Sequence, residues 1–370
     1  MEPAPGAGPR RAAYAAAGVD VTAGELAVDM LRRRLAAPGL DLLGGLGGFG
    51  AALPLPEGYR QPVLVAATDG VGTKTEIARA LDRLGSIGQD LVAMCADDVV
   101  CHGARPTFFL DYVAVGRLEP ARVAALVGGI ADACSSIGCA LVGGETAEHP
   151  GLMEPDSFDL AGFCVGLVER ELLLDGSRCR AGDVVLGLAS SGLHANGYSL
   201  VRALVARHGL ALEQPYAEVL AEHGREAGEA GDLSLGEVLL TPTRLYAGAL
   251  LELRDDLLAR GLRLGAIQHV TGGGLATNLA RGVPAGLGVR LRTGSWPMPD
   301  LFGLLASLGG LDDAELRATF NCGLGMALVV EPAAVDLCVS RLAERGIDAW
   351  PVGELRPLAE LGERRYVEVS

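Results

Sequence analysis

Short apolar stretches that suit buried strands alternate with longer stretches of helical periodicity along most of this chain of 370 residues. The first half is expected to form strands at residues 63–67, 107–115 and 159–168 and helices at residues 88–101 and 119–137. After the polar run DGSRCRAGD, a strand is expected at residues 184–189, a charged surface insertion at residues 214–232 and a helix at residues 243–259. Because strands and helices that alternate in this way build layered α/β folds, we expect two α/β domains, residues 1–175 and residues 176–370.

The charge and the cysteines exclude several classes of function. The formal net charge is −15, so the chain repels nucleic acid and anionic membrane surfaces, and neither is an expected partner. The eight cysteines form no Cys-x-x-Cys pair and no zinc-type spacing, which favours a reducing, cytoplasmic compartment. Residues 1–24 are expected to be a mobile arm without a signal-peptide core, followed by a helix at residues 25–35. No apolar run reaches membrane-spanning length.

Four motifs combine glycine with acids, hydroxyl groups, a lysine or a histidine. They are ATDGVGTK at residues 67–74, MCADD at residues 94–98, GGETAE at residues 143–148 and SSGLHANG at residues 190–197. Flexible backbone beside such side chains suits a site that holds a polyphosphate with its magnesium ion and activates a second substrate. The four motifs together predict an enzyme that uses ATP.

The first motif differs from a Walker A phosphate loop. Thr73 precedes Lys74 where a glycine is needed. Asp69 ends an expected strand and is a candidate metal ligand, and Lys74 is expected to reach a phosphate as a point charge. The alternative is a polar turn with a solvated lysine. The glycine-rich residues 44–50 have no strand before them and no helix after them, so they form either a flap over a nucleotide or a plain loop.

Helical geometry separates the two neighbouring acids of the second motif. At about 100° per residue, Asp98 falls in the apolar stripe with Met94, whereas Asp97 falls near Asp90 on the polar side. A carboxylate that faces a core is costly unless it is paired or bound to a metal. Asp98 is therefore the better candidate for a catalytic or metal-binding acid, and a buried ion pair is the alternative.

Hard cations take oxygen ligands from separate segments, so Asp69, Asp98 and Glu145 form the expected magnesium set. His194 lies in a glycine- and serine-rich loop that opens a helix, which suits an anionic substrate. This setting makes His194 the favoured catalytic histidine, with a structural role as the alternative. His269 precedes three glycines and a helix, which is a second possible phosphate pocket.

These motifs closely resemble the phosphoribosylformylglycinamidine cyclo-ligases, also called aminoimidazole ribonucleotide synthetases. The resemblance runs from YAAAGVD at residues 14–20 to AWPVGEL at residues 349–355. Between them stand GGLGGFGAAL, IGQDLVAMC, GARPTFFLDY, DLAGFCVG, LTPTRLY, HVTGGG and FNCGLGM. The resemblance implies ATP and magnesium on the first α/β domain, and a homodimer whose first domains join their sheets into a barrel. It also implies an ATP-dependent ring closure through a phosphorylated amide oxygen, with release of ADP and phosphate.

The resemblance also implies which residues form the site. The catalytic residues would be His194, Lys74 and Asp98, and whether His194 stabilises the activated oxygen or moves a proton stays open. Those that hold the cofactor would be Gly47, Gly48, Thr68, Asp69, Gly72, Thr73, Lys74, Gly143, Gly144 and Glu145. Those that hold the ribonucleotide substrate would be Ser190, Ser191, His194, Asn196, Gly197, Thr271, Gly272, Gly273, Gly274, Asn321 and Gly323.

Two positions depart from the pattern of this family, which usually has asparagine at Asp97 and methionine at His149. A sister ATP-dependent enzyme of the same superfamily is one alternative. A selenophosphate synthetase, however, would carry a reactive cysteine in its N-terminal glycine-rich loop, and the first cysteine here is Cys95. A catalytically silent nucleotide-binding dimer is another alternative, but it would lose the acids or Lys74, which are present.

Overall fold

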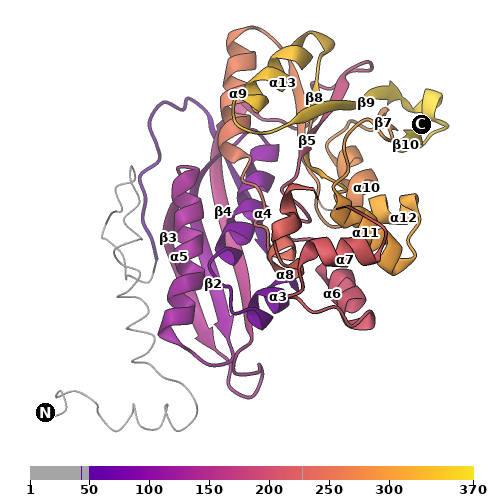
Figure 1. The fold of residues 1–370 in the computed structure, drawn as a ribbon. Coiled ribbons are helices and arrows are strands. Elements are labelled where there is room, and N and C mark those ends of the chain that lie inside the picture. The colour runs from indigo at the N-terminus through magenta and orange to yellow at the C-terminus, as the bar shows by residue number, and fades with distance from the viewer. Residues whose placement is uncertain (1–42, 44–49, 227) are drawn as a thin grey trace, which may run out of the picture.

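The computed structural model of the chain describes residue 43, residues 50–226 and residues 228–370, and these form two packed sheet domains (Figure 1). The expected arm at residues 1–24, the expected helix at residues 25–35, and Gly47 and Gly48 lie outside the described residues.

The first domain is built on a four-stranded sheet in the order β1-β4-β2-β3. Strands β1 and β2 both pair antiparallel with β4, and β2 pairs parallel with β3 through the crossover helix α5, as a parallel pair requires. Helices α4 and α5 cover one face of this sheet (Figure 1). The elements are β1 (Pro62–Gly70), α3 (Lys74–Ala80), α4 (Ile87–Cys101), β2 (Arg105–Val115), α5 (Pro120–Ser136), β3 (Ala140–Glu148) and β4 (Phe158–Glu169), with a 3-10 turn at Arg170–Leu172.

The second domain is built on a six-stranded sheet in the order β10-β7-β9-β5-β8-β6, in which only the β10–β7 pair of the described strands is parallel. Its strands are β5 (Val184–Ala189), β6 (Leu264–His269), β7 (Leu287–Arg292), β8 (Leu324–Val330), β9 (Ala349–Pro357) and β10 (Tyr366–Val369). Its helices are α6 (Tyr198–Arg207), α7 (Tyr216–Glu222), α8 (Leu235–Leu239), α9 (Ala247–Ala259), α10 (Gly274–Arg281), α11 (Asp300–Gly309), α12 (Asp313–Thr319) and α13 (Val335–Ala343), with 3-10 turns at Glu229–Asp232, Pro332–Ala334 and Leu358–Leu361. The expected boundary at residue 176 falls between the last strand of the first sheet and the first strand of the second.

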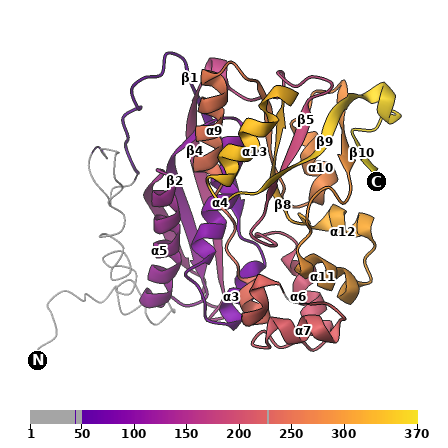
Figure 2. The same cartoon turned by 45° about the horizontal axis from the view of Figure 1, so that its top comes forward.

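Helix α4 lies at the centre of the molecule, between the first sheet and the second domain (Figure 2). Twelve of its 15 residues are buried, so it has no solvent side along most of its length. Gly88 lets α5 approach closely, because a Cβ there would lie 2.2 Å from the Ile130 nitrogen. Helix α4 therefore packs directly against both domains.

The expected strands and helices of the first half are confirmed within a few residues. The expected surface insertion at residues 214–232 is wrong in part, because α7 buries Tyr216, Val219 and Leu220. The helix expected from residue 243 begins only at Ala247, since residues 243–246 bind side chains of α4. In the part of the chain that the structure describes, no helix is both long enough and apolar enough to cross a bilayer.

Candidate active site

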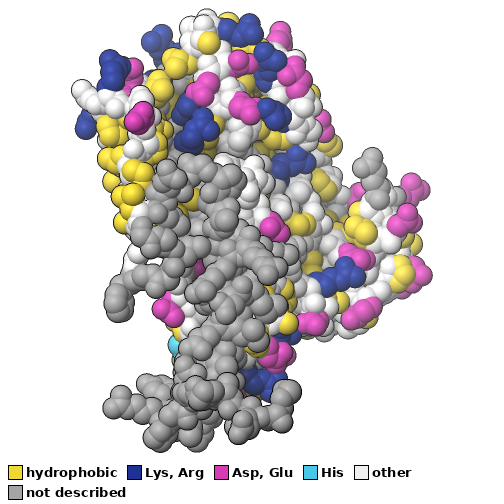
Figure 3. All heavy atoms as spheres, turned by 90° about the vertical axis from the view of Figure 1, so that its left-hand side faces the viewer, with side chains coloured by type: hydrophobic (Ala, Val, Ile, Leu, Met, Phe, Trp, Pro, Cys, Tyr) yellow, Lys and Arg dark blue, Asp and Glu magenta, His cyan; other side chains and the backbone are white. Residues whose placement is uncertain are grey.

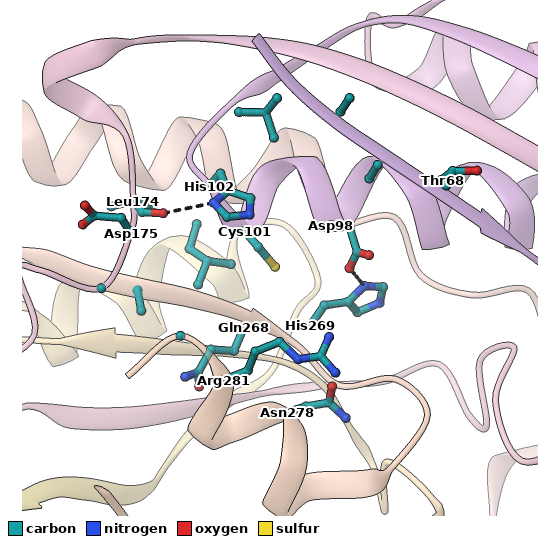
Figure 4. Close-up of a pocket in the computed structure, with 17 residues that line it drawn as sticks. Thr68, Asp98, Cys101, His102, Leu174, Asp175, Gln268, His269, Asn278 and Arg281 are labelled. Atoms are coloured by element: carbon teal, nitrogen blue, oxygen red, sulfur yellow. Dashed lines mark hydrogen bonds and ion pairs between the residues drawn. The ribbon is translucent and has the colours of Figure 1, made fainter. Parts of the chain in front are cut away.

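A cavity of about 440 Å³ lies between the two domains (Figure 4). Polar side chains from β1, α4, β6 and α10 gather toward one end, which we call the polar end, and they are Thr68, Asp98, His269, Asn278 and Arg281. The opposite end is of mixed character, with Leu174 beside His102 and Asp175. A cavity lined by apolar side chains and a cluster of polar groups is the usual form of a site for a small molecule.

Asp98 and His269 form a pair at the polar end. The Nδ1 atom of His269 lies 2.9 Å from Asp98 Oδ1. The side chain of Asp98 is 40 % exposed and that of His269 is 2 % exposed. The Nε2 atom of His269 is buried and has no hydrogen-bond partner among the described residues. A carboxylate on one ring nitrogen fixes the orientation of the imidazole and leaves the other nitrogen for a ligand.

Asp69 lies at the end of β1, within electrostatic range of Asp98. Burial and the neighbouring charge of Asp98 raise the pKa of Asp69, although the backbone N–H of Gly70 donates to its carboxylate at 2.7 Å. A cation between the two carboxylates would relieve this repulsion. Magnesium is usually held by one or two carboxylates together with substrate phosphates, and Asp69 with Asp98 fits that arrangement. Among the described residues no group of three or more His, Cys, Asp or Glu has metal-site geometry.

The prediction that Glu145 joins these two acids is wrong within one chain. Glu145 is exposed on β3, which is the edge strand opposite β1 in the first sheet. Because strands lie about 4.8 Å apart, the two edges are separated by about 14 Å. Gly143 and Gly144 lie on the same strand, so they do not approach Asp69 either.

The predicted burial of the two neighbouring acids is reversed. Asp97 is wholly buried, and its carboxylate accepts a hydrogen bond of 3.1 Å from the backbone nitrogen of Tyr246, at the start of α9. Burial raises the pKa of Asp97 to about 7. The side of the helix that carries Asp90 and Asp97 meets Thr243 and Tyr246 of the second domain and not solvent, which helical periodicity cannot reveal. Asp98 still lines the cavity, as its proposed role requires.

Lys74 also differs from its predicted role as a phosphate ligand. Its side chain is fully buried and its Nζ donates to Asp90 Oδ1 at 2.8 Å, to the carbonyl of His194 at 3.0 Å and to the carbonyl of Thr241 at 2.7 Å. Asp90 Oδ1 also accepts from the nitrogen and hydroxyl of Thr243. Burial lowers the pKa of Lys74 and raises that of Asp90, and the attraction between the two opposes both shifts. We call this group of five residues the Lys74 cluster.

The predicted loops of the second domain do meet one another. The side chains of Ser190 and Asn321 both donate to the carbonyl of Gly192 at 2.9 Å, and Asn321 Oδ1 accepts from the nitrogen of Gly323 at 2.9 Å. The Asn196 amide lies beside Gly272, where an added Cβ would be 3.5 Å from its oxygen. The loops after β5 and β6 and the loop before β8 therefore form one surface, and none of the predicted substrate residues on it is among those that line the cavity.

His194 is buried within this surface. Its Nε2 accepts a hydrogen bond of 3.2 Å from the nitrogen of Ser191, and its Nδ1 is buried without a partner in the described part of the chain. Burial, followed by the charges of His269 and Lys74, holds the pKa of His194 well below its usual value. The ring is therefore neutral, with its proton on Nδ1. A neutral Nδ1–H group can donate a hydrogen bond but adds no charge.

The turn before α10 is held by Asn278. Its side-chain nitrogen donates to the carbonyls of Thr271, Gly272 and Gly274. Gly273 and Gly274 have φ values of 91° and 66°, which favour glycine, so this turn needs two of the three glycines.

Two further residues that were predicted to hold the cofactor, Gly72 and Thr73, lie just before α3. Thr73 Oγ1 lies 3.1 Å from Ser199 Oγ across the domain boundary, and Gly72 is exposed at the start of α3. His149, one of the departures from the family pattern, meets the Tyr112 hydroxyl at 3.2 Å and does not line the cavity.

Of the residues that line the cavity, the predicted site contains only Thr68 and Asp98. His269 is predicted only as part of a second phosphate pocket, and the triple glycine after it is the signal that points to it. Arg281 is exposed at the end of α10 and forms no ion pair with a described residue. Gln268 donates to the Leu279 carbonyl, and its oxygen is buried without a described partner. Arg281 stands in no motif, and Gln268 only precedes the HVTGGG motif, so neither could be recognised from the sequence.

Comparisons with known families match both domains. Residues 53–168 match the family described as AIR synthase related protein, N-terminal domain. Residues 180–361 match the family described as AIR synthase related protein, C-terminal domain.

The chain is also similar to curated proteins along nearly its whole length. It is 46 % identical over 348 residues to the phosphoribosylformylglycinamidine cyclo-ligase of Geobacillus kaustophilus, which covers 93 % of this chain and 95 % of the relative. It is 46 % identical over 343 residues to the protein of that name from Thermosynechococcus vestitus, with 92 % and 95 % covered.

Solved structures share the fold at lower identity. Thiamine-monophosphate kinase from Stenotrophomonas maltophilia has a TM-score of 0.64 at 20 % identity and covers 93 % of this chain and 95 % of its own. The hydrogenase maturation protein HypE in complex with ATP has a TM-score of 0.64 at 21 % identity, with 93 % and 90 % covered. Similarity at this level shows the fold alone.

Proposed function

Because the chain belongs to the family of phosphoribosylformylglycinamidine cyclo-ligases, we propose that its interdomain cavity closes the imidazole ring of aminoimidazole ribonucleotide. The chain is an ATP-dependent ligase that forms a C–N bond in purine biosynthesis, as its family is. The substrate is formylglycinamidine ribonucleotide, and ADP and phosphate are released with the product. The observation that carries the proposal is the cavity itself, which brings Asp98 of the first domain against His269 of the second.

The nucleotide is assigned to the polar end of the cavity. Asp69 and Asp98 would hold the magnesium ion that accompanies ATP, and the ion would neutralise charge on the transferring phosphoryl group. Arg281 lines the same cavity without an ion pair to a described residue, so its guanidinium is available to an anion. His269 lines this end and is held there by Asp98, and its Nε2 is buried without a described partner.

The reaction needs activation because an amide oxygen is a poor leaving group. Transfer of the γ-phosphoryl group of ATP to the formyl oxygen forms an O–P bond and breaks the bond to ADP. The ring-closing nitrogen of the amidine then attacks the same carbon, and phosphate leaves with the oxygen. Holding the two ends of the substrate together supplies the entropic advantage of an intramolecular reaction. His194 is buried and is not among the residues that line the cavity, so its neutral Nδ1–H can donate to the activated oxygen only if the loop at residues 190–197 opens to the substrate.

Turnover tests this proposal directly. Purified protein is incubated with formylglycinamidine ribonucleotide, ATP and magnesium, and the imidazole product and phosphate are quantified together. We expect one phosphate for each ring that closes. Hydrolysis of ATP without an imidazole product would contradict the assignment.

We also propose that the protein is a homodimer joined through the first sheet. The sheet face turned away from α4 and α5 exposes Leu64, Phe163 and Tyr112 on three neighbouring strands, with exposed fractions of 65 %, 40 % and 41 %. The side seen in Figure 3 carries a band of hydrophobic side chains along its left edge. Exposed apolar patches of this kind mark interaction surfaces. Light scattering should give a dimer mass for the wild type and a lower mass for Phe163→Glu, and a wild-type monomer at micromolar concentration would contradict the proposal.

A further inference from the structure

Lys74 is the only lysine in the chain, and every other one of the 31 lysine and arginine residues is an arginine. The two side chains are not interchangeable, because lysine ends in a compact ammonium with three donors whereas arginine ends in a broad planar fork. A chain that uses arginine at all its other cationic positions has kept an ammonium at one fully buried position. The position therefore needs the shape of the ammonium and not merely a positive charge.

The three acceptors around Lys74 satisfy that shape completely. One is Asp90 Oδ1 on α4, in the first domain, and the other two are the main-chain carbonyls of His194 and Thr241, in the second domain. The ring of Tyr198 lies 5.5 Å from Nζ and covers one side. Lys74 is not among the residues that line the interdomain cavity. Its ammonium consequently has no donor left for a phosphate.

The bond to His194 supports a strained backbone. His194 has a φ of 64°, which is the left-handed region that residues other than glycine rarely adopt. Such a conformation persists only where the surroundings hold it in place. The carbonyl of His194 is held by Lys74, and its ring is held by the nitrogen of Ser191. The direction of the unpartnered Nδ1–H depends on both contacts.

We propose that Lys74 is a positioning residue, whose ammonium fixes the main chain of His194 and thereby aims its imidazole for ring closure, without contact to the nucleotide. The kinetic part of this inference rests on the proposed function. The structural part does not, since it concerns only which groups the ammonium touches. If Lys74 were a phosphate ligand instead, its ammonium would have to leave its three acceptors. The buried carboxylate of Asp90 would then lose its counterion.

The single lysine makes the structural part directly measurable. In protein labelled uniformly with 13C and 15N, the single lysine side-chain signal reports on Lys74 alone. The protein is titrated with a non-hydrolysable ATP analogue and magnesium, and the backbone signals of Asp69 and Asp98 serve as the internal record of binding. We expect the lysine signal to keep its position and its slow proton exchange while the backbone signals shift. A lysine shift that follows the binding curve would overturn the proposal.

The kinetic part is tested with Lys74→Met/Asp90→Asn, which removes both charges and so leaves no unpaired buried ion. We expect kcat to fall about a hundredfold, because a misplaced catalytic group costs that much. The KM for ATP should change less than about threefold, since no nucleotide contact is lost. Amide exchange in the loop at residues 190–197 should accelerate about tenfold or more as the loop loosens. Thr243→Val is the matched control, because it removes one hydroxyl from Asp90 and leaves the bond to His194.

The outcomes separate this inference from the proposed function. Wild-type kcat in the double variant, or loss of ATP affinity by more than about tenfold, would overturn the positioning role. If the double variant does not fold, the lysine signal of the wild type decides between the two assignments. If the wild type does not turn over formylglycinamidine ribonucleotide, the proposed function fails, and the lysine signal and the loop exchange still decide what Lys74 contacts.

Discussion

Two polar clusters meet helix α4, and they differ in how exposed their charged side chains are. In the Lys74 cluster every donor of the ammonium has an acceptor and both charged side chains are fully buried, although Asp90 Oδ2 has no described partner. In the cavity, the side chain of Asp98 is 40 % exposed. An ion pair closed off from solvent holds a structure together, whereas a carboxylate exposed in a cavity is available to a ligand. The comparison assigns structure to the first cluster and chemistry to the second.

Removing the counterion of the buried cluster should have the largest effect. Asp90→Ala leaves the ammonium of Lys74 buried and unpaired, so we expect a loss of about 3–5 kcal/mol in the free energy of unfolding. Chemical denaturation measures the loss. Lys74→Met/Asp90→Ala, which buries no lone charge, should recover most of it. Equal stability of the wild type and Asp90→Ala would show that the pair is not a structural tie.

Removing a cavity carboxylate should affect turnover and not folding. Asp98→Asn weakens the support of His269 and the proposed magnesium site, so we expect kcat to fall about 10–100-fold with little change in stability. Asp97→Asn is the matched control on the next residue. The asparagine oxygen can still accept from the nitrogen of Tyr246, so activity and stability should stay close to wild type. Equal losses of kcat in Asp98→Asn and Asp97→Asn would show that the cavity carboxylate has no special role in turnover.

Asp111 is a third buried acid, and its effect is measured in the pH dependence of the free energy of unfolding. Asp111 on β2 is buried, one of its oxygens has no described partner, and burial raises its pKa to about 7. A folded-state pKa above the unfolded value of about 3.9 means that its contribution is fully present below about pH 4 and is lost as the pH rises through 7. Asp111→Asn should therefore stabilise the protein at pH 8 by on the order of 1 kcal/mol and change little at pH 5.

Denaturation at both pH values measures the difference, with the exposed acid Asp232→Asn as the control. A pH dependence that is the same in Asp111→Asn and in the wild type would contradict the shift. Burial also raises the pKa of Asp97 to about 7, so part of the wild-type slope should remain in the Asp111 variant.

The smallest effect is expected at the exposed counterpart of the buried tie. The hydroxyls of Thr73 and Ser199 also join the two domains, but on the surface. Water replaces such a bond readily, so Ser199→Ala should change the free energy of unfolding by less than about 0.5 kcal/mol. A loss comparable to that of Asp90→Ala would mean that interdomain bonds matter irrespective of burial.

The sequence predicted the alternation of elements well, because strand and helix patterns are local. The resemblance to a family along the whole chain assigned the loops of Ser190, Thr271 and Asn321 to the substrate, and this assignment stays a prediction. The sequence did not predict which faces are buried. Helical periodicity shows which side chains share a face, but not whether that face meets solvent or a second domain. For this reason the predicted burial of Asp97 and that of Asp98 are the wrong way round.

Two other differences have the same origin in tertiary contacts. The pattern that placed Lys74 beside glycines did not reveal that three acceptors from distant segments would enclose it. Glu145 shares a glycine-rich motif with the expected metal ligands, but strand order moves it to the far edge of the sheet. Arg281 lines the cavity from the C-terminal end of α10, where the sequence carries no motif.

Nucleotide affinity tests the central claim most directly, because the two clusters predict opposite results for it. Calorimetry with a non-hydrolysable ATP analogue and magnesium is carried out on the wild type, Asp98→Asn and Lys74→Met/Asp90→Asn at one pH and salt concentration. We expect Asp98→Asn to weaken binding about tenfold or more and the double variant to bind within about threefold of the wild type. Intact binding in Asp98→Asn together with lost binding in the double variant would contradict the account.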